Sequence, residues 1–299
     1  MSVYNCYDCN TVLCKDCSRK HKDENKNQRH LMQLISNSFI LNFKFRATLF
    51  SYHKSISDIK YLPNGELIVL IARENAVKTF SVTGIQRHNI RLEDNPLKMT
   101  VVDKNTVAVL LINRSLAIVD IQQNHVQYIR DIAIPYSSDT LIYIKNEFYI
   151  SYFIMRDGIV VIDMSGSVKR HIPLSFTPYD MCYDVDSQRI YCLDREHGKL
   201  ICIDRDGNGI FTFTDPGMTD LIDLTIDNEG NVLGLCRNDD SSGNVIKVDS
   251  NGEKSKEVIT NIKTLYVYPR ICYDYFTNSV VIASDIEVYI YKKNERVNI

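Results

Sequence analysis

The residues of this chain with the clearest capacity for chemistry are metal ligands crowded into its first thirty positions. Four of the nine cysteines and two of the seven histidines lie there. Two C-x2-C pairs form tight knuckles that each point two thiolates at one cation, and zinc takes four sulfur or nitrogen ligands in a tetrahedron. The spacing therefore predicts Zn2+ binding by this segment. The six candidate ligands are Cys6, Cys9, Cys14, Cys17, His21 and His30.

The composition is that of an ordinary globular protein, with 44% of its 299 residues apolar and 24% charged. Its apolar runs are too short to cross a bilayer and no secretory signal is visible, so we expect no membrane association. The five cysteines outside the cluster, an odd number, lie in apolar strand-like runs, where a free thiol behaves as a small hydrophobic group. These features favour a reducing, cytoplasmic setting.

Behind residue 45 the sequence repeats. Short β-rich runs alternate with two-residue turn signals that are spaced 40, 41, 42, 42 and 48 residues apart. A unit of four short strands with this period is typical of a β-propeller blade, and one blade cannot bury both faces of its sheet, so blades stack around an axis. The turn signals are Asn64-Gly65, Lys104-Asn105, Lys145-Asn146, Ser187-Gln188, Glu229-Gly230 and Thr277-Asn278.

The period predicts an all-β fold, a six-bladed β-propeller over residues 45–299, preceded by a small zinc-binding module over residues 1–35 and a linker over 36–44. The last unit is one strand short, and we expect the strand-like run Phe43–Phe50 to supply that strand, which closes the ring without a free edge. The six units are 57–94, 95–136, 137–176, 177–219, 220–267 and 268–299.

An aspartate follows an aliphatic residue at the end of one strand in four of the units. Turn residues come next, so we expect these carboxylates to initiate turns by accepting backbone N–H bonds rather than to take part in catalysis. The four aspartates are Asp120, Asp163, Asp204 and Asp249.

The cysteine cluster is similar to the second part of a B-box zinc finger, both in its ligand spacing and in the text CYDCNTVLCKDCSRKH with the apolar tail HLMQL. A B-box holds eight ligands in two cross-braced sites, so the resemblance implies one complete site and one half site at Cys14 and Cys17. A complete Cys2His2 site with no open position is structural. The alternatives are a single site that joins Cys14 and Cys17 to the histidines, and a shortened module that binds metal poorly. The ligands implied for the complete site are Cys6, Cys9, His21 and His30.

The repeats resemble an NHL-type propeller in their period and in their strand-Asp-turn-Gly ends, whereas the absence of tryptophan excludes the WD type. A B-box followed by an NHL-like propeller resembles the tripartite-motif (TRIM) proteins. This resemblance implies a propeller that recognises a protein partner. The RING finger that would supply ubiquitin-ligase activity has no counterpart in the sequence, and neither has the coiled coil. We therefore expect a zinc-binding recognition scaffold that is not an enzyme.

The partner is expected to contact the loops that enter the inner strand of each blade, because such loops vary while the blade core stays fixed. These loops are His53–Ser57, Pro96–Lys98, Pro135–Ser138, Phe176–Tyr179, Pro216–Asp220 and Tyr266–Pro269.

Two other functions stay open. The first is binding of single-stranded RNA by a basic, aromatic face, although residues 45–299 hold 28 Lys and Arg against 33 Asp and Glu. The second is a metal-dependent hydrolase with carboxylates around Ca2+ on the axis; the simpler role of those carboxylates is to cap turns or to hydrogen-bond to neighbouring blades. The basic residues are Arg156, Lys169, Arg170 and His171. The carboxylates are Asp58, Asp180 and Asp223.

Overall fold

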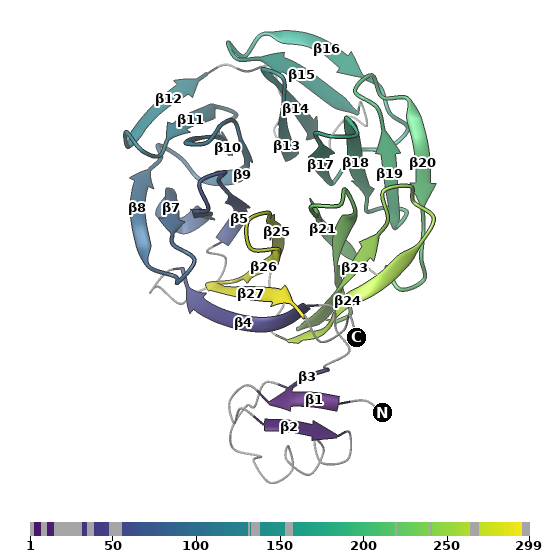
Figure 1. Cartoon of the computed structure of the whole chain (residues 1–299). Coiled ribbons are helices and arrows are strands. Elements are labelled where there is room, and N and C mark those ends of the chain that lie inside the picture. The colour runs from purple at the N-terminus through teal and green to yellow at the C-terminus, as the bar shows by residue number, and fades with distance from the viewer. Residues whose placement is uncertain are drawn as a thin grey trace.

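Six four-stranded antiparallel sheets form a closed ring around a central axis (Figure 1). In five of the sheets the strands follow one another in chain order from the axis outward, and in the sixth the outermost strand comes from the N-terminal side of the propeller. The all-β, six-bladed propeller predicted from the repeat is therefore confirmed. The computed structural model describes residues 3–6, 11–14, 32–34, 39–47, 56–130, 132, 138–152, 158–218, 220–239, 241–263 and 269–294.

Each blade is one sheet. Blade 1 contains β5 (Ile56–Tyr61), β6 (Leu67–Ile71), β7 (Ala76–Phe80) and β8 (Gln86–Arg91), with the 3-10 turn η1 (Ala72–Glu74) between β6 and β7. Blade 2 contains β9 (Pro96–Val101), β10 (Thr106–Leu111), β11 (Leu116–Asp120) and β12 (His125–Ile129). Blade 3 contains β13 (Ser138–Ile144), β14 (Glu147–Tyr152), β15 (Ile159–Asp163) and β16 (Val168–Ile172). Blade 4 contains β17 (Asp180–Asp184), β18 (Arg189–Asp194), β19 (Lys199–Ile203) and β20 (Gly209–Phe213). Blade 5 contains β21 (Leu221–Ile226), β22 (Val232–Arg237), β23 (Ser242–Val248) and β24 (Ser255–Lys263). Blade 6 contains β25 (Arg270–Asp274), β26 (Ser279–Ser284), β27 (Glu287–Lys293) and β4 (Phe39–Arg46).

The core of the propeller lies between consecutive blades, where six clusters of buried apolar side chains fill the interfaces. The second strand of a blade is covered on both faces, which explains why β6 reads as an unbroken apolar run with every residue buried. The outer strands alternate instead, because only one face meets a neighbour; in β12 His125 and Gln127 are exposed.

The strand that closes the ring comes from the N-terminal side of the propeller. β4 pairs antiparallel with β27, with Leu41 opposite Tyr291, and buries Phe39 and Leu41 between blades 5 and 6. The closing strand is thus Phe39–Arg46 rather than the predicted Phe43–Phe50, and the propeller begins inside the predicted linker 36–44. The shift arises because register is set by which alternate side chains are buried, and here these begin at Phe39.

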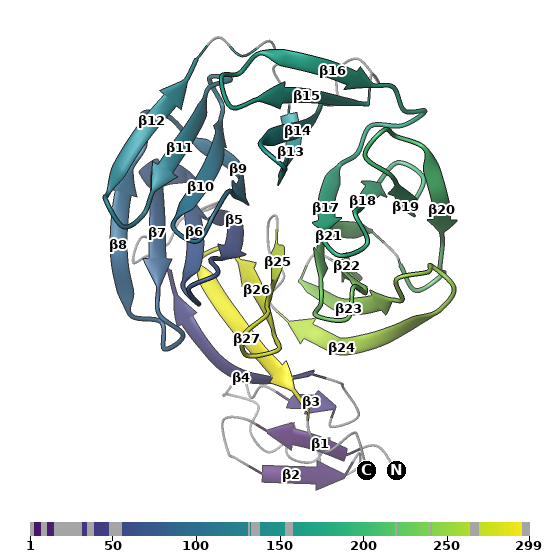
Figure 2. The same cartoon turned by 45° about the horizontal axis from the view of Figure 1, so that its top comes forward.

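A separate three-stranded sheet precedes the propeller. Its order is β2 (Thr11–Cys14), β1 (Val3–Cys6), β3 (Met32–Leu34). It lies outside the ring beside blades 5 and 6, and β3 contacts β24 of blade 5 (Figures 1 and 2). Within the described ranges, no helix has the length and apolar character needed to cross a bilayer.

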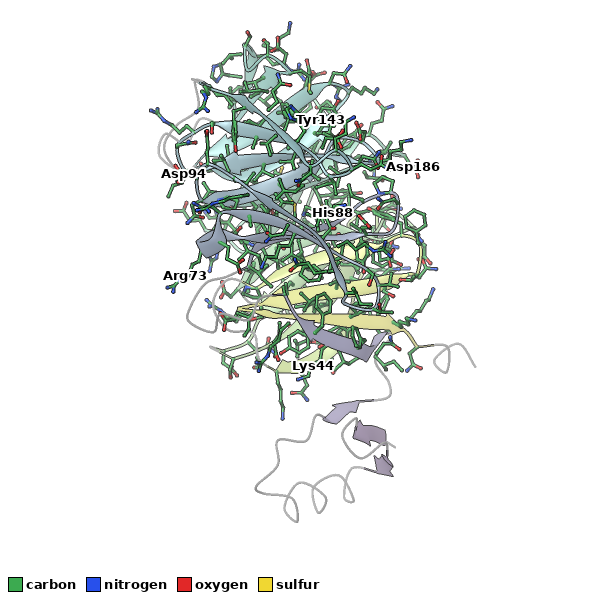
Figure 3. All side chains as sticks on the ribbon, turned by 90° about the vertical axis from the view of Figure 1, so that its left-hand side faces the viewer. Lys44, Arg73, His88, Asp94, Tyr143 and Asp186 are labelled. Carbon is green, nitrogen blue, oxygen red and sulfur yellow. The ribbon has the colours of Figure 1, made fainter. Side chains whose placement is uncertain are left out.

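The two ends of the ring are built from different connections. All six predicted turns join the first strand of a blade to the second, and we call the end where they lie the hairpin-turn end. Viewed edge-on in Figure 3, Asp186 of one such turn lies at this end. Arg73, between β6 and β7, and Asp94, just before β9, lie at the opposite end. The loops that enter the inner strands are therefore on the other end of the ring from the turns.

Candidate ligand site on the propeller axis

A ring of polar side chains surrounds the axis, and we call it ring one. Strand residues alternate between two faces, so one residue at a matching position of each inner strand points to the axis. These side chains are buried or nearly so, and they include the three aspartates singled out from the sequence. The members of ring one are Asp58, Lys98, Thr140, Asp180, Asp223 and Arg270.

Ring one ties each blade to the next. In four blades its oxygen accepts the backbone N–H of the residue that follows the ring-one position in the next blade. The aspartates thus hydrogen-bond to neighbouring blades, the simpler of the two roles expected for them. The bonds are Met99 N to Asp58 Oδ2 at 2.9 Å, Met181 N to Thr140 Oγ1 at 3.1 Å, Leu224 N to Asp180 Oδ2 at 2.8 Å, and Ile271 N to Asp223 Oδ2 at 2.7 Å.

The two cationic members cannot accept, and they donate instead. Lys98 Nζ donates to Asp180 Oδ1 at 3.1 Å and to Asp223 Oδ1 at 3.2 Å. Arg270 Nε donates to the carbonyl oxygen of Ser57 at 2.7 Å, and its Nη1 lies 3.8 Å from Asp223 Oδ1. The cations occupy the space between the carboxylates, and among the described residues no three acidic, His or Cys side chains are grouped as metal ligands. The Ca2+ arrangement proposed from the sequence phase is therefore not assembled here.

The charges of ring one shift one another's pKa values. Burial opposes the ionised form of Asp180, but Lys98 and Lys60, together with hydrogen bonds to the carboxylate, outweigh it, and the pKa of Asp180 is lowered. Burial raises the pKa of Asp223, and the adjacent Asp180 carboxylate adds to that shift. Burial and Arg270 both act to lower the pKa of Lys98, yet the three carboxylates hold it above the ordinary value. Lys98 therefore stays charged at neutral pH.

Beyond ring one the axis opens towards the hairpin-turn end into a cavity of about 520 Å³. Four ring-one residues form its floor. Its wall contains a second ring, ring two, made by the residues two positions further along each inner strand. Ring two consists of Lys60, Thr100, Ile142, Cys182, Thr225 and Cys272.

Lys60 carries the charge of ring two. Its Nζ lies 3.8 Å from Asp58 Oδ1, and it makes no hydrogen bond to any residue that the structure describes. Burial opposes the charged amine, but the carboxylates of ring one, Asp58 foremost, keep the pKa of Lys60 above its ordinary value. Burial raises the pKa of Cys182 and of Cys272, so both thiols are protonated at neutral pH.

The mouth of the cavity is aromatic and partly exposed. Tyr61, Tyr143 and Tyr183 line it at the ends of inner strands. Three residues of the turns complete the rim, with exposed fractions of 73% for Val185, 53% for Tyr275 and 63% for Phe276. Desolvation of the hydroxyl raises the pKa of Tyr275 to about 12 even though half of this side chain is exposed. The three exposed side chains form the apolar rim.

The sequence suggested the opposite end of the ring as the contact surface. Of the described residues in the six predicted loops, Lys98 alone lines the cavity. Parts of four loops, residues 53–55, 135–137, 219 and 266–268, lie outside the described residues. One sequence signal points to the cavity: a tyrosine recurs three positions after the ring-one residue in four blades. These residues are Tyr61, Tyr143, Tyr183 and Tyr273.

The zinc ligands are described only in part. Cys6 ends β1 and Cys14 ends β2, whereas Cys9, Cys17, His21 and His30 lie outside the described residues. In the β1–β2 register Cys6 is opposite Thr11 and Cys14 is opposite Val3. The first cysteines of the two C-x2-C pairs are therefore at opposite ends of this ribbon. Zinc binding itself stays a prediction.

The basic group proposed for RNA is divided by the sheet. Lys169 and His171 are exposed on β16, and Arg156 lies outside the described residues. Arg170 alternates to the other face, where Nη1 donates to Glu147 Oε2 at 3.2 Å. Of the three members of this group that the structure describes, Lys169 and His171 are exposed, whereas Arg170 lies on the other face of the sheet.

An open groove of about 620 Å³ between blades 3 and 4 is lined by three arginines. Their guanidinium groups are already engaged. Arg170 and Arg205 both donate to the hydroxyl of Tyr149, at 2.6 and 3.2 Å, and both pair with Glu147. Arg189 donates to the carbonyl oxygen of Ser250 at 2.9 Å. The groove therefore offers less positive charge to an anion than its composition suggests.

The fold is similar to that of several solved propellers. A streptogramin B lyase matches with a TM-score of 0.62 and 10% identity, covering 84% of this chain and 97% of the lyase. Virginiamycin B lyase from Staphylococcus aureus matches with a TM-score of 0.60 and 12% identity, covering 85% and 99%. A protein of unknown function from Bacteroides thetaiotaomicron matches with a TM-score of 0.63 and 13% identity, covering 86% and 73%. No family model and no curated protein matches the sequence. At these identities the likeness shows the fold alone.

Proposed function

We propose that the propeller is a recognition module that binds a polypeptide partner at its hairpin-turn end, with an apolar group of the partner inserted into the axial cavity. The observation that carries this proposal is the cavity of about 520 Å³ surrounded by the exposed apolar rim. A pocket of this size suits one bulky anchor, and partner proteins typically gain most of their affinity from such anchors in desolvated pockets.

The chemistry of the cavity favours binding over catalysis. The carboxylates of ring one are committed to backbone N–H groups and to Lys98, so none is placed as a free general base. The thiols of Cys182 and Cys272 are held in the protonated form, which is the poor nucleophile. Lys60 is charged and lacks a lone pair for attack. These groups can hold a ligand but are not activated to transform one.

A selection from a displayed library of random peptides tests the proposal. We expect wild-type protein to enrich peptides with a shared apolar residue, and the double variant Tyr275→Ser with Phe276→Ser to enrich none of them. The matched control is Val82→Ser with Ile85→Ser, two side chains that are 52% and 67% exposed on a blade 1 turn away from the cavity. Equal enrichment by the rim variant and the wild type would refute the proposed site.

The N-terminal module is a second, separate proposal. We propose that it binds zinc as a shortened B-box of the tripartite-motif type. Ligand spacing supports this, and so does the β1–β2 register, because a cross-braced pair of sites needs its two cysteine knuckles at different ends of the ribbon. Its test is the zinc measurement given in the Discussion.

A further inference from the structure

We propose that Lys60 binds a carboxylate of the ligand that enters the axial cavity, so that the ligand is an organic acid with an apolar or aromatic body. This inference rests on the proposed function and specifies the chemistry of what that site accepts. The observation that supports it is the position of the Lys60 ammonium, which lies among the uncharged side chains of ring two and deeper in the cavity than its aromatic mouth.

Of the described cationic groups on the axis, the ammonium of Lys60 has the fewest polar partners. Lys98 makes two hydrogen bonds to carboxylates, and Arg270 has both a carbonyl partner and an ion pair. Among the residues that the structure describes, the one polar contact of Lys60 is with Asp58 at 3.8 Å, which is longer than a hydrogen bond. Both oxygens of Asp58 already accept backbone N–H groups, from Ile59 at 2.9 Å and Met99 at 2.9 Å. Lys60 therefore has N–H donors to offer to a ligand.

The other members of ring two agree with an acceptor rather than a cation as the occupant. Ring two contains no carboxylate, and its two thiols are protonated. The hydroxyl oxygen of Thr100 accepts the N–H of Tyr143 at 3.1 Å, so its proton is directed elsewhere. A cationic ligand would be repelled by Lys60 and would find no carboxylate in ring two to pair with. An anionic ligand would be attracted by the Lys60 ammonium and could accept hydrogen bonds from the thiols and hydroxyls of ring two.

A carboxylate fits this site better than a phosphate. Phosphate sites in proteins commonly combine guanidinium forks, backbone N–H groups or helix N-termini. Ring two offers one point charge and no arginine, which matches a single negative charge.

The lining of the cavity also favours a ligand with an apolar body. Lys60 lies three residues, roughly 10 Å along the strand, before the turn at Pro63-Asn64. Between this lysine and the solvent the wall is formed by Leu62, Val101, the tyrosines and the apolar rim. A small hydrated anion would leave these surfaces in contact with water, whereas an aromatic acid would cover them. The arrangement selects a ligand that is acidic at its inner end and apolar along its length.

Fluorine NMR titration of the full chain tests the inference with two probes, 3-(4-fluorophenyl)propionate and the corresponding amide. A charge-assisted hydrogen bond is worth about tenfold or more in affinity, so wild type should bind the acid at least tenfold more tightly than the amide. Lys60→Met should bind both probes with the affinity of the amide. The matched control Lys104→Met removes the same charge from an exposed turn at the same end and should behave as wild type.

Equal affinity of wild type for acid and amide overturns the inference, as does no saturable binding of either probe or an acid preference that survives in Lys60→Met. The wild-type ratio needs no variant, so the test stands even if Lys60→Met fails to fold. The acetylated peptide Gly-Gly-Phe, with a free or an amidated C-terminus, identifies the source of the carboxylate. Tighter binding of the free-acid peptide than of the propionate assigns it to a partner's C-terminus; the reverse order assigns it to a free organic acid.

Failure of the inference differs from failure of the proposed function. Suppose that the selected peptides require the apolar rim for binding, but that their free-acid and amide forms bind equally. The propeller then recognises a polypeptide partner as proposed, and the role inferred for Lys60 is wrong. If the acid probe binds through Lys60 while no peptide depends on the rim, the cavity takes organic acids and the polypeptide partner is wrong.

Discussion

Replacing Asp223 with alanine should destabilise the propeller more than any change of a turn aspartate. The side chain is fully buried, accepts Ile271 N at 2.7 Å and Lys98 Nζ at 3.2 Å, and lies 3.8 Å from Arg270. Its loss leaves two buried cations with one counter-charge fewer. Removing one partner of a buried ion pair costs about 3–5 kcal/mol, of which about 1–3 kcal/mol is the unpaired N–H group. We expect a loss of unfolding free energy of about 3–5 kcal/mol.

Urea unfolding at pH 7, followed by circular dichroism, measures this loss as a shift of the midpoint at constant slope. The control is Asp204→Ala, which removes the acceptor of the Asp206 and Asn208 N–H groups in an exposed turn. It should cost about 0.5–1.5 kcal/mol. Adding Lys98→Met to Asp223→Ala should cost less than the sum of the single changes, because both charges leave together. A midpoint shift for Asp223→Ala no larger than the control's, or strict additivity, would show that ring one does not hold the blades together.

Three further outcomes are expected. Gly158→Ala should unfold at clearly lower urea than Gly65→Ala: both residues have positive φ, at 88° and 83°, but a Cβ at Gly158 would lie 2.2 Å from a backbone oxygen whereas one at Gly65 meets nothing within 4 Å. Native Cys182 should react with a disulfide reagent at pH 8 at least roughly tenfold more slowly than in urea, because burial raises the pKa of its thiol; equal rates would contradict this. Zinc content should be about one per chain and fall to near zero in Cys6→Ser with Cys9→Ser, as measured by mass spectrometry; undiminished zinc would rule out the cross-braced assignment.

The repeat could be read from the sequence because turn chemistry and burial recur together. Turns such as Asn64-Gly65 and Glu229-Gly230 place glycine where the backbone needs positive φ, and an apolar second strand follows each of them. The closing strand was harder to place. The prediction Phe43–Phe50 began four residues too far along the chain, because a strand-like run does not reveal which alternate side chains are buried.

The sequence predicted the axial site only in part. The period placed Asp58, Asp180 and Asp223 at matching positions, and the same phase contains Lys98 and Arg270. Considered alone, the three aspartates suggest ligands for a metal ion. Considered together, the six members of ring one show that the negative charges of the aspartates are nearly balanced by Lys98 and Arg270. The position of a residue within its repeat unit does not show which end of the axis stays open, because that depends on the volumes of the side chains packed across the axis.

The pairing of β4 with β27 sets an order of events during synthesis. β4 leaves the ribosome roughly 250 residues before its partner, a wait of roughly 10–50 s at typical translation rates. For that time an apolar strand has both edges open to other nascent chains. The last blade therefore closes only after the strands of the other five blades have been synthesised, and until then the unpaired edges of β4 are a hazard for association between chains.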